Sequence, residues 1–387
     1  MASTPINDQI AGGATEIVLT EDMTENVVIP SGKTISIDLA GFSLSNLIDP
    51  LDDSTIDYTI TVNGTLVLTD SSEEGTGILD NTNGLGLIKN NGVLTINGVK
   101  AFTFSGTAGN YFIVNRKTMT VTDMATTADD IAGYTAFILN GYLSTDDMTG
   151  ATVCTLTVNG GEYAGSIPFV QNDSFGQLVV TGGEFEVSAG AIFDNRNIAN
   201  ISDGTFTSEG TYIFVTGAYG TLPQCKGEFD IIGGTFEGNK AIQDTTETND
   251  SGHVHTNAHT YVSGGTWTLE DTESLDDFVK PGYLIVLEDG VITFIHEVEW
   301  TYPEGGVVGI GFFGYRRAVI HNDSIEYEAG GFDVPVRGFV PTCIIGCMAR
   351  GGCDAYYNPE TKKIQLYRNG TEITERLFDV TIVMIGQ

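Results

Sequence analysis

Three histidines form the pattern in this chain that is most typical of a metal site. His253 and His255 make an H-x-H pair, and His259 follows four residues later, just before a predicted strand. Alternate residues of an extended segment point to the same side, so His253 and His255 could share a metal ion, and a three-fold assembly would bring six imidazoles together. Solvated histidines of a surface loop are the simpler interpretation. We therefore expect no cofactor, with a metal ion at these histidines as the alternative.

The five cysteines divide between two regions of the chain, with Cys154 and Cys225 in one and Cys343, Cys347 and Cys353 in the other. The C-x3-C-x5-C spacing could supply three zinc ligands, but no fourth Cys or His lies close in sequence, and zinc ribbons use tighter C-x2-C pairs. We expect small buried side chains instead. Synthesis in a cytoplasm predicts reduced thiols.

Paired carboxylates are the remaining source of catalytic chemistry. A polysaccharide lyase needs an Arg or Lys beside the sugar acid, and a glycoside hydrolase needs two carboxylates at a set separation. Arg116-Lys117 and Arg196 do not lie in a recognisable lyase motif. The adjacent acid pairs lie among Ser, Thr and Leu in turn-like segments: Asp52-Asp53, Asp129-Asp130, Asp146-Asp147 and Asp276-Asp277. We predict no catalytic residue, and a polysaccharide lyase or hydrolase is the alternative.

A recurrent glycine-aromatic phrase indicates what positions these side chains. Its aromatic residues are separated by 22, 21, 30 and 31 residues, and each phrase follows a short alternating apolar run. A near-fixed period in this range is typical of a solenoid whose units stack on one another. The five phrases are Gly160-Gly161-Glu162-Tyr163, Gly182-Gly183-Glu184-Phe185, Asp203-Gly204-Thr205-Phe206, Gly233-Gly234-Thr235-Phe236 and Gly264-Gly265-Thr266-Trp267.

A parallel β-helix accounts for these residue types. Each coil would contribute short strands that pair with the coils above and below at about 4.8 Å per rung. Apolar side chains would stack inside, and Gly-Gly would provide the positive-φ corners. The repeated aromatic is predicted to be an interior ladder, with a carbohydrate-stacking stripe as the alternative.

Earlier segments carry the same pattern and a resemblance to a known family. Ile29–Leu44, Ile60–Asp70 and Gly92–Gly98 resemble the opening coils of right-handed β-helix proteins of the pectate-lyase-like class, found in bacterial surface proteins and phage spikes. The resemblance covers residues 14 to 295. It implies a fold and not a function, because that architecture serves lyases, hydrolases, adhesins and inert virion parts alike.

Charge divides the chain into two predicted domains. Residues 1–298 hold 9 basic and 40 acidic side chains, net −31, whereas residues 299–387 hold 8 and 11, net −3. We predict a β-helix rod over 1–296, with an N-terminal arm or cap at 1–12, and a second domain over 297–387. The overall charge of −34 repels phosphate backbones, so a nucleic-acid partner is not expected. No apolar run approaches 18 residues, so a membrane partner is not expected either.

The second domain is predicted to be a small antiparallel β-sandwich or jelly roll. Its short β-branched segments are separated by turn chemistry, such as Asn358-Pro359-Glu360-Thr361 between two strands. Tyr327–Gly331, Tyr357–Tyr367 and the closing strand at Ile385-Gly386 resemble the small β-sandwich proteins that tailed phages carry as capsid decoration or head-fibre subunits. The three cysteines and Gly309–Gly314 depart from that pattern.

The predicted function combines these features. The first ten residues lack a basic region, an apolar core and a cleavage site, so we expect no exported adhesin but a phage virion protein made in the bacterial host cytoplasm. The resemblance implies a non-enzymatic capsid decoration or head-fibre protein, a homotrimer, with the major capsid protein or another virion protein as partner and a host-surface glycan as a further one. A tailspike that binds or cleaves a surface polysaccharide is the alternative. Candidate interface residues of the second domain are Phe312, Phe313, Phe339 and Tyr327.

Overall fold

The computed structural model is mostly β and divides into two compact units, Met1–Ile295 and His296–Gln387. Each unit is described by itself. The structure describes residues 4–47, 58–81, 84–104, 111–128, 135–143, 145–218, 225–245, 258–281, 283–288, 290–296, 307–310, 315–326, 331–333, 341–348, 353–368, 371–373 and 376–386.

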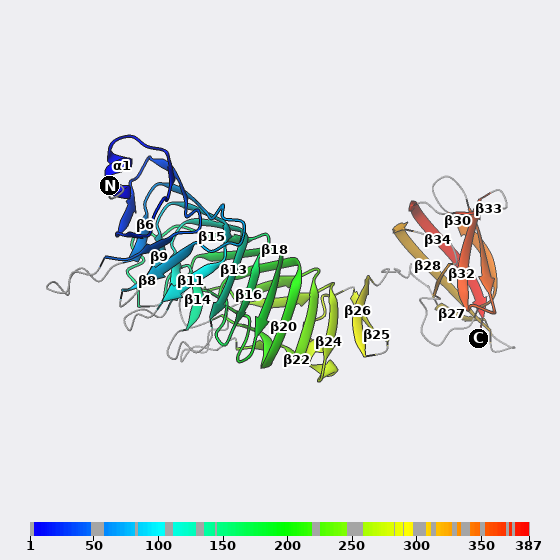
Figure 1. Cartoon of the computed structure of the whole chain (residues 1–387). Helices are drawn as coiled ribbons and strands as arrows, with labels where there is room; N and C mark the ends of the chain where they lie inside the picture. The colour runs from blue at the N-terminus through cyan, green and yellow to red at the C-terminus, as the bar shows by residue number, and fades with distance from the viewer. Residues whose placement is uncertain are drawn as a thin grey trace. The chain divides into compact units, whose positions relative to one another are not determined.

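The first unit is a stack of coils whose strands pair in parallel with the equivalent strands of neighbouring coils (Figure 1). The first column contains β1 (Glu16–Val18), β4 (Thr34–Asp38), β7 (Thr65–Thr69), β10 (Val93–Val99), β13 (Thr118–Ala128), β15 (Cys154–Val158), β18 (Gly176–Val187), β20 (Ile198–Thr216), β21 (Glu228–Ile231) and β23 (His259–Val262). This pairing of coil upon coil is consistent with the predicted β-helix.

Two further columns complete each coil. The second contains β13, β16 (Glu162–Gly165), β18, β20, β22 (Thr235–Asp244) and β24 (Thr266–Leu269). The third contains β3 (Val27–Ile29), β6 (Tyr58–Val62), β9 (Gly86–Asn90), β12 (Tyr111–Asn115), β14 (Ala136–Asn140), β17 (Val170–Asn172), β19 (Phe193–Asn195), β20 and β22. A separate parallel sheet in the early coils contains β2 (Met23–Thr24), β5 (Ser43–Ser45), β8 (Ile78–Asn81) and β11 (Ala101–Phe104).

The repeated aromatic residues form a ladder inside the coils. Phe206 is fully buried, and its ring centroid lies 5.0 Å from those of both Phe185 and Phe236, with the rings nearly parallel. The stack continues to Trp267, 3.8 Å from Phe236. Gly204 lies two residues before Phe206 and has a φ of 128°. A Cβ added to Gly204 would come within 2.8 Å of the Phe206 ring. The prediction of an interior ladder is confirmed, and the carbohydrate-stacking alternative is wrong for these residues.

A second ladder inside the coils is polar and was not predicted. An asparagine is the last residue of successive strands in the third column. Its side-chain N–H donates a hydrogen bond to the side-chain oxygen of the asparagine in the next coil. For example, Asn140 Nδ2 lies 2.7 Å from Asn172 Oδ1 and 3.1 Å from the Gln177 carbonyl oxygen. All members are fully buried. Their hydrogen-bonding groups are paired with one another and with backbone carbonyl oxygens, as buried polar groups require. The ladder runs through Asn90, Asn115, Asn140, Asn172 and Asn195 and ends at the Thr216 hydroxyl.

Both ends of the coil stack are covered. At the N-terminal end, α1 (Ile6–Ala11) buries Ile6 and Ile10, and the Glu25 carboxylate accepts hydrogen bonds from the backbone N–H of Ile6 and Asn7. At the other end, β25 (Tyr283–Glu288) precedes β26 (Val291–His296), which pairs antiparallel with β24, and the 3-10 helix η2 (Thr272–Phe278) buries Leu275. An antiparallel strand cannot continue the parallel register, so it protects the last coil from pairing with another chain.

The second unit contains two antiparallel sheets. One has the order β27 (Val307–Ile310), β28 (Tyr315–Glu326), β34 (Arg376–Gly386) and β30 (Pro341–Met348). The other has the order β29 (Phe332–Asp333), β32 (Lys363–Arg368) and β31 (Asp354–Asn358), with β33 (Thr371–Glu372) paired to β32.

The hairpin predicted at Asn358-Pro359-Glu360-Thr361 is present between β31 and β32. The Asn358 side-chain oxygen accepts hydrogen bonds from the N–H of Glu360 and Thr361, at 2.9 and 3.3 Å. The antiparallel character of the second unit is therefore confirmed, and its assignment as a sandwich or jelly roll stays a prediction.

Truncating one amide of the asparagine ladder should destabilise the first unit strongly. In Asn140→Ala the Asn115 amide loses an acceptor and the Asn172 oxygen loses its donor, so we expect the free energy of unfolding to fall by about 3 kcal/mol. Denaturant unfolding followed by circular dichroism measures this. Asn91→Ala is the matched control, because the Asn91–Asn63 amide pair is exposed, and its expected change is below about 0.5 kcal/mol. Equal losses in the two variants would contradict the structural role of the ladder.

Candidate functional site

Of the predicted metal ligands, only His259 lies within the described residues. It belongs to β23, stacks on Tyr261 with ring centroids 4.7 Å apart, and places Nε2 3.7 Å from the Asp230 carboxylate. His253 and His255 lie outside the described residues, as do the interface candidates Phe312, Phe313, Phe339 and Tyr327. In the described part of the chain, no group of three or more His, Cys, Asp or Glu side chains is arranged to hold a metal ion.

The cysteines differ in their burial. Cys154 and Cys225 are buried, and burial raises the pKa of each thiol to about 11, so both are protonated at neutral pH. This agrees with the prediction of small buried side chains. Cys347 and Cys353 are only half-buried, so the prediction of small buried side chains is wrong for this pair, and their sulfur atoms lie 3.1 Å apart. The side chain of Cys343 lies outside the described residues.

The adjacent acid pairs that can be placed have local roles. Asp146 accepts hydrogen bonds from Arg116 Nη2 at 2.8 Å and from the Leu143 N–H at 2.7 Å. Asp147 is exposed, and hydrogen bonds from Thr149 lower its pKa. Asp276 and Asp277 belong to η2, whereas Asp52-Asp53 and Asp129-Asp130 lie outside the described residues.

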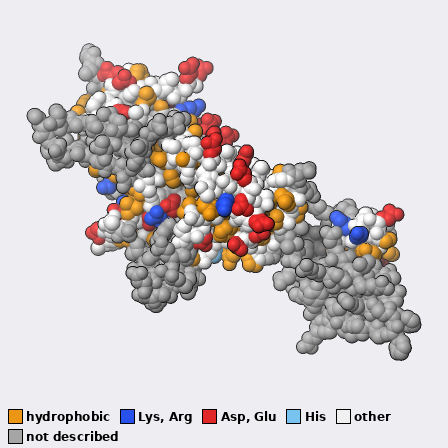
Figure 2. Space-filling view, turned by 90° about the horizontal axis from the view of Figure 1, so that it is seen from below, with side chains coloured by type: hydrophobic (Ala, Val, Ile, Leu, Met, Phe, Trp, Pro, Cys, Tyr) orange, Lys and Arg blue, Asp and Glu red, His pale blue; other side chains and the backbone are white. Residues whose placement is uncertain are grey.

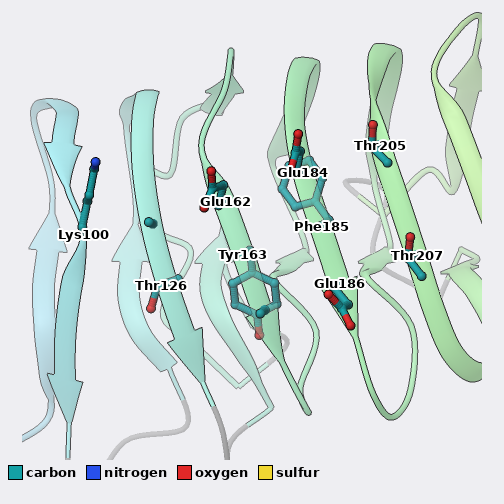
Figure 3. Close-up of a pocket in the computed structure, with 11 residues that line it drawn as sticks. Lys100, Thr126, Glu162, Tyr163, Glu184, Phe185, Glu186, Thr205 and Thr207 are labelled. Carbon is teal, nitrogen blue, oxygen red and sulfur yellow. The ribbon is translucent and has the colours of Figure 1, made fainter.

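The surface of the first unit carries a trough lined by carboxylates and hydroxyls, which we call the Glu/Thr face. It lies over β16, β18 and β20, where the residues next to each buried aromatic point outward. Glu162 is the register partner of Glu184, which in turn pairs with Thr205, and Figure 3 shows these side chains on neighbouring strands. A hollow of about 320 Å³ lies among Glu162, Glu184, Glu186, Thr205, Thr207 and Lys100.

The Glu/Thr face presents acceptors and hydroxyls at the repeat of the coils. A second hollow of about 400 Å³ shares Glu162, Glu184 and Thr205 and continues past the glycine corners to Thr235. Carboxylates repel an anionic ligand, while a neutral hydroxylated chain could donate hydrogen bonds to them. On the face of the first unit drawn in Figure 2, acidic side chains are more prominent than basic ones.

A second feature that the sequence did not predict is a cluster of buried polar side chains just after the strands of the third column. Asp173 accepts hydrogen bonds from Gln171 Nε2 at 2.8 Å and from the Ser174 N–H at 2.7 Å, and Arg196 Nη1 lies 3.6 Å away. Gln171 accepts in turn from Tyr111, and burial raises the pKa of Tyr111 to about 12. Tyr111 and Cys225 are both neutral at neutral pH, and the hydrogen bonds of the cluster hold this corner of the coil together. The sequence signal was an ionic residue directly after a ladder asparagine, as in Asn172-Asp173 and Asn195-Arg196.

One further carboxylate, Asp70, fastens a turn. Its oxygens accept hydrogen bonds from the N–H of Gly77 at 2.7 Å, Gly41 at 2.8 Å and Ser72 at 3.2 Å, and from the Ser72 hydroxyl at 2.9 Å. Burial acts to raise the pKa of Asp70, and these hydrogen bonds outweigh it and hold the pKa below the ordinary value of 3.8.

Comparisons with known proteins add no relative, since no family model, curated protein or solved structure matches this chain. Within the described residues, no helix combines the length and apolarity needed to cross a membrane.

The contribution of Asp70 to stability should depend on pH. Because its folded pKa is lowered, the stabilisation is present above the unfolded pKa of about 3.9 and is lost as pH falls through the folded pKa. Asp70→Asn should lower the free energy of unfolding by about 2 kcal/mol at pH 7, and the difference from the parent should shrink below about pH 3. Denaturant unfolding across this pH range measures it. A difference in the free energy of unfolding that is constant with pH would show that the charge of Asp70 does not contribute to stability.

Proposed function

We propose that this chain is a non-enzymatic structural protein of a tailed-phage virion, a capsid decoration or head-fibre protein. In this proposal the first unit is a right-handed parallel β-helix that projects outward, and the second unit is a β-sandwich that docks on the major capsid protein. The proposed location is the virion, assembled from protein made in the host cytoplasm.

The observation that carries this proposal is the continuity of the two ladders inside the first unit. The asparagine ladder runs from Asn90 to Thr216, and the aromatic ladder runs from Tyr163 to Trp267. Among the described residues, apolar side chains fill the interior of the coil stack, and elements of the same chain cover both ends. Such a stack is suited to act as a stiff spacer.

The distribution of charge supports the proposed polarity. Net −31 over residues 1–298 opposes packing against an acidic shell, whereas net −3 over residues 299–387 leaves the second unit free to dock through apolar contact. Salt screens exposed charges only beyond about 8 Å at physiological ionic strength, so the repulsion acts at contact distance.

The Glu/Thr face favours a second candidate function, binding or cleavage of a host surface polysaccharide by a tailspike. The two hollows that share Glu162, Glu184 and Thr205 follow successive coils, as a linear hydroxylated polymer would. The carboxylates restrict this candidate to a neutral or cationic glycan.

Capsid binding by the full-length chain tests the first candidate. Tyr356 is 58% exposed in the second unit, and we expect Tyr356→Asp to weaken co-sedimentation with undecorated capsids by at least about tenfold, since a buried charge opposes docking. Ile232→Asp is the matched control, because Ile232 is 59% exposed in the first unit.

Two outcomes would contradict the proposed docking. Loss of capsid binding in Ile232→Asp alone would reverse the polarity. Absence of capsid binding, together with retention on host polysaccharide that Glu184→Gln abolishes, would favour the tailspike.

The proposed assembly is a homotrimer. Light scattering of the purified chain at micromolar concentration should give about three times the mass of one chain. The number three comes from the resemblance to phage spikes and capsid decoration proteins, and we expect some of the apolar side chains of a second unit of about 90 residues to face a partner. A monomer mass would count against the trimer.

A further inference from the structure

Two thiols of the second unit lie close enough to react with each other. The Sγ atoms of Cys347 and Cys353 are 3.1 Å apart, about 1 Å more than a sulfur–sulfur bond. Cys347 belongs to β30 of the four-stranded sheet, and Cys353 directly precedes β31 of the other sheet. A bond between them would therefore join two sheets that share no strand pairing among the described residues.

We propose that Cys347 and Cys353 form a reversible disulfide that fastens the two sheets of the second unit to each other. The oxidant is a small-molecule disulfide such as oxidised glutathione. One protein thiolate attacks it and forms a mixed disulfide, releasing one glutathione thiol; the second protein thiolate then displaces the other. Overall, two protein thiols lose two hydrogens, one sulfur–sulfur bond forms, and the oxidant is reduced to two thiols.

The surroundings of the two thiols favour this pair over the buried cysteines. Both are half-buried, so a small oxidant can approach, whereas Cys154 and Cys225 are 0% and 2% exposed. Cys225 Sγ contacts the Ser174 hydroxyl at 3.0 Å, and Cys154 donates to the Thr152 carbonyl oxygen, so neither faces another described sulfur.

Burial and the neighbouring Cys353 raise the pKa of Cys347, so the Cys347 thiol is protonated at neutral pH.

The reaction would make the second unit sensitive to its surroundings. In a reducing cytoplasm the thiols stay free, and in an oxidising medium the bond forms. The inference does not depend on the capsid proposal, because it concerns only the chemistry of this unit.

Peptide mapping of the full-length chain tests the pairing directly. The folded protein is equilibrated with mixtures of reduced and oxidised glutathione, free thiols are alkylated, and the denatured chain is digested with trypsin. Cleavage after Arg337, Arg350 and Lys362 separates a peptide with Cys343 and Cys347 from a peptide with Cys353. We expect the two peptides to become linked through Cys347 as the oxidised fraction rises, while Cys154 and Cys225 remain alkylatable after denaturation.

Variants identify the bond. Cys343→Ser is the matched control and should keep the link, whereas Cys347→Ser and Cys353→Ser should each lose it. Oxidation should also raise the melting temperature of the second unit by about 5 °C in the parent and not in Cys353→Ser.

Three outcomes would overturn the proposal. They are no linked peptides at any glutathione ratio, a link formed through Cys343, and zinc that survives dialysis and protects all three thiols from alkylation. Fragmentation spectra and metal analysis of the same samples distinguish them.

Discussion

The structure of the first unit depends on one constraint, which is that equivalent residues of successive coils lie directly above one another. Parallel in-register pairing at about 4.8 Å per rung turns each inward position into a continuous column of side chains. A column must then be chemically consistent along its length. Aromatic rings satisfy this by stacking, as Phe185, Phe206 and Phe236 do, and amides satisfy it by donating to the amide above and accepting from the amide below.

The same constraint makes a single mismatch visible. Thr260 occupies an inward position whose register partner in the preceding coil is Phe229, and among the described residues its buried hydroxyl has no hydrogen-bond partner. It lies in the last coil of its column, where β23 is followed by the capping elements. The ladder chemistry weakens where the stack ends, which is also where an antiparallel strand replaces the parallel register.

Stacking also organises the outer surface. The residues on either side of each inward aromatic point outward in every coil. Glu162, Glu184 and Thr205 therefore form a row because of the strand register, and the fold requires no contact between their side chains. The interior therefore fixes the positions of the outer side chains, and their identities are free to serve a partner. The second unit follows different rules, because its strands pair antiparallel.

The sequence by itself determined the parallel coil architecture, the burial of the repeated aromatic and the hairpin at Asn358, because each depends on local periodicity or turn chemistry. It did not reveal the asparagine ladder, because its members have no shared flanking phrase comparable to the glycine that precedes each repeated aromatic. It also could not show that Asp173 meets Arg196, that Asp70 receives the N–H of Gly41, or that Cys347 approaches Cys353.

These are contacts across coils or sheets, and only the tertiary structure decided them. A local pattern specifies which face of a strand is buried. The loop lengths and the register of pairing specify which distant side chain lies above it.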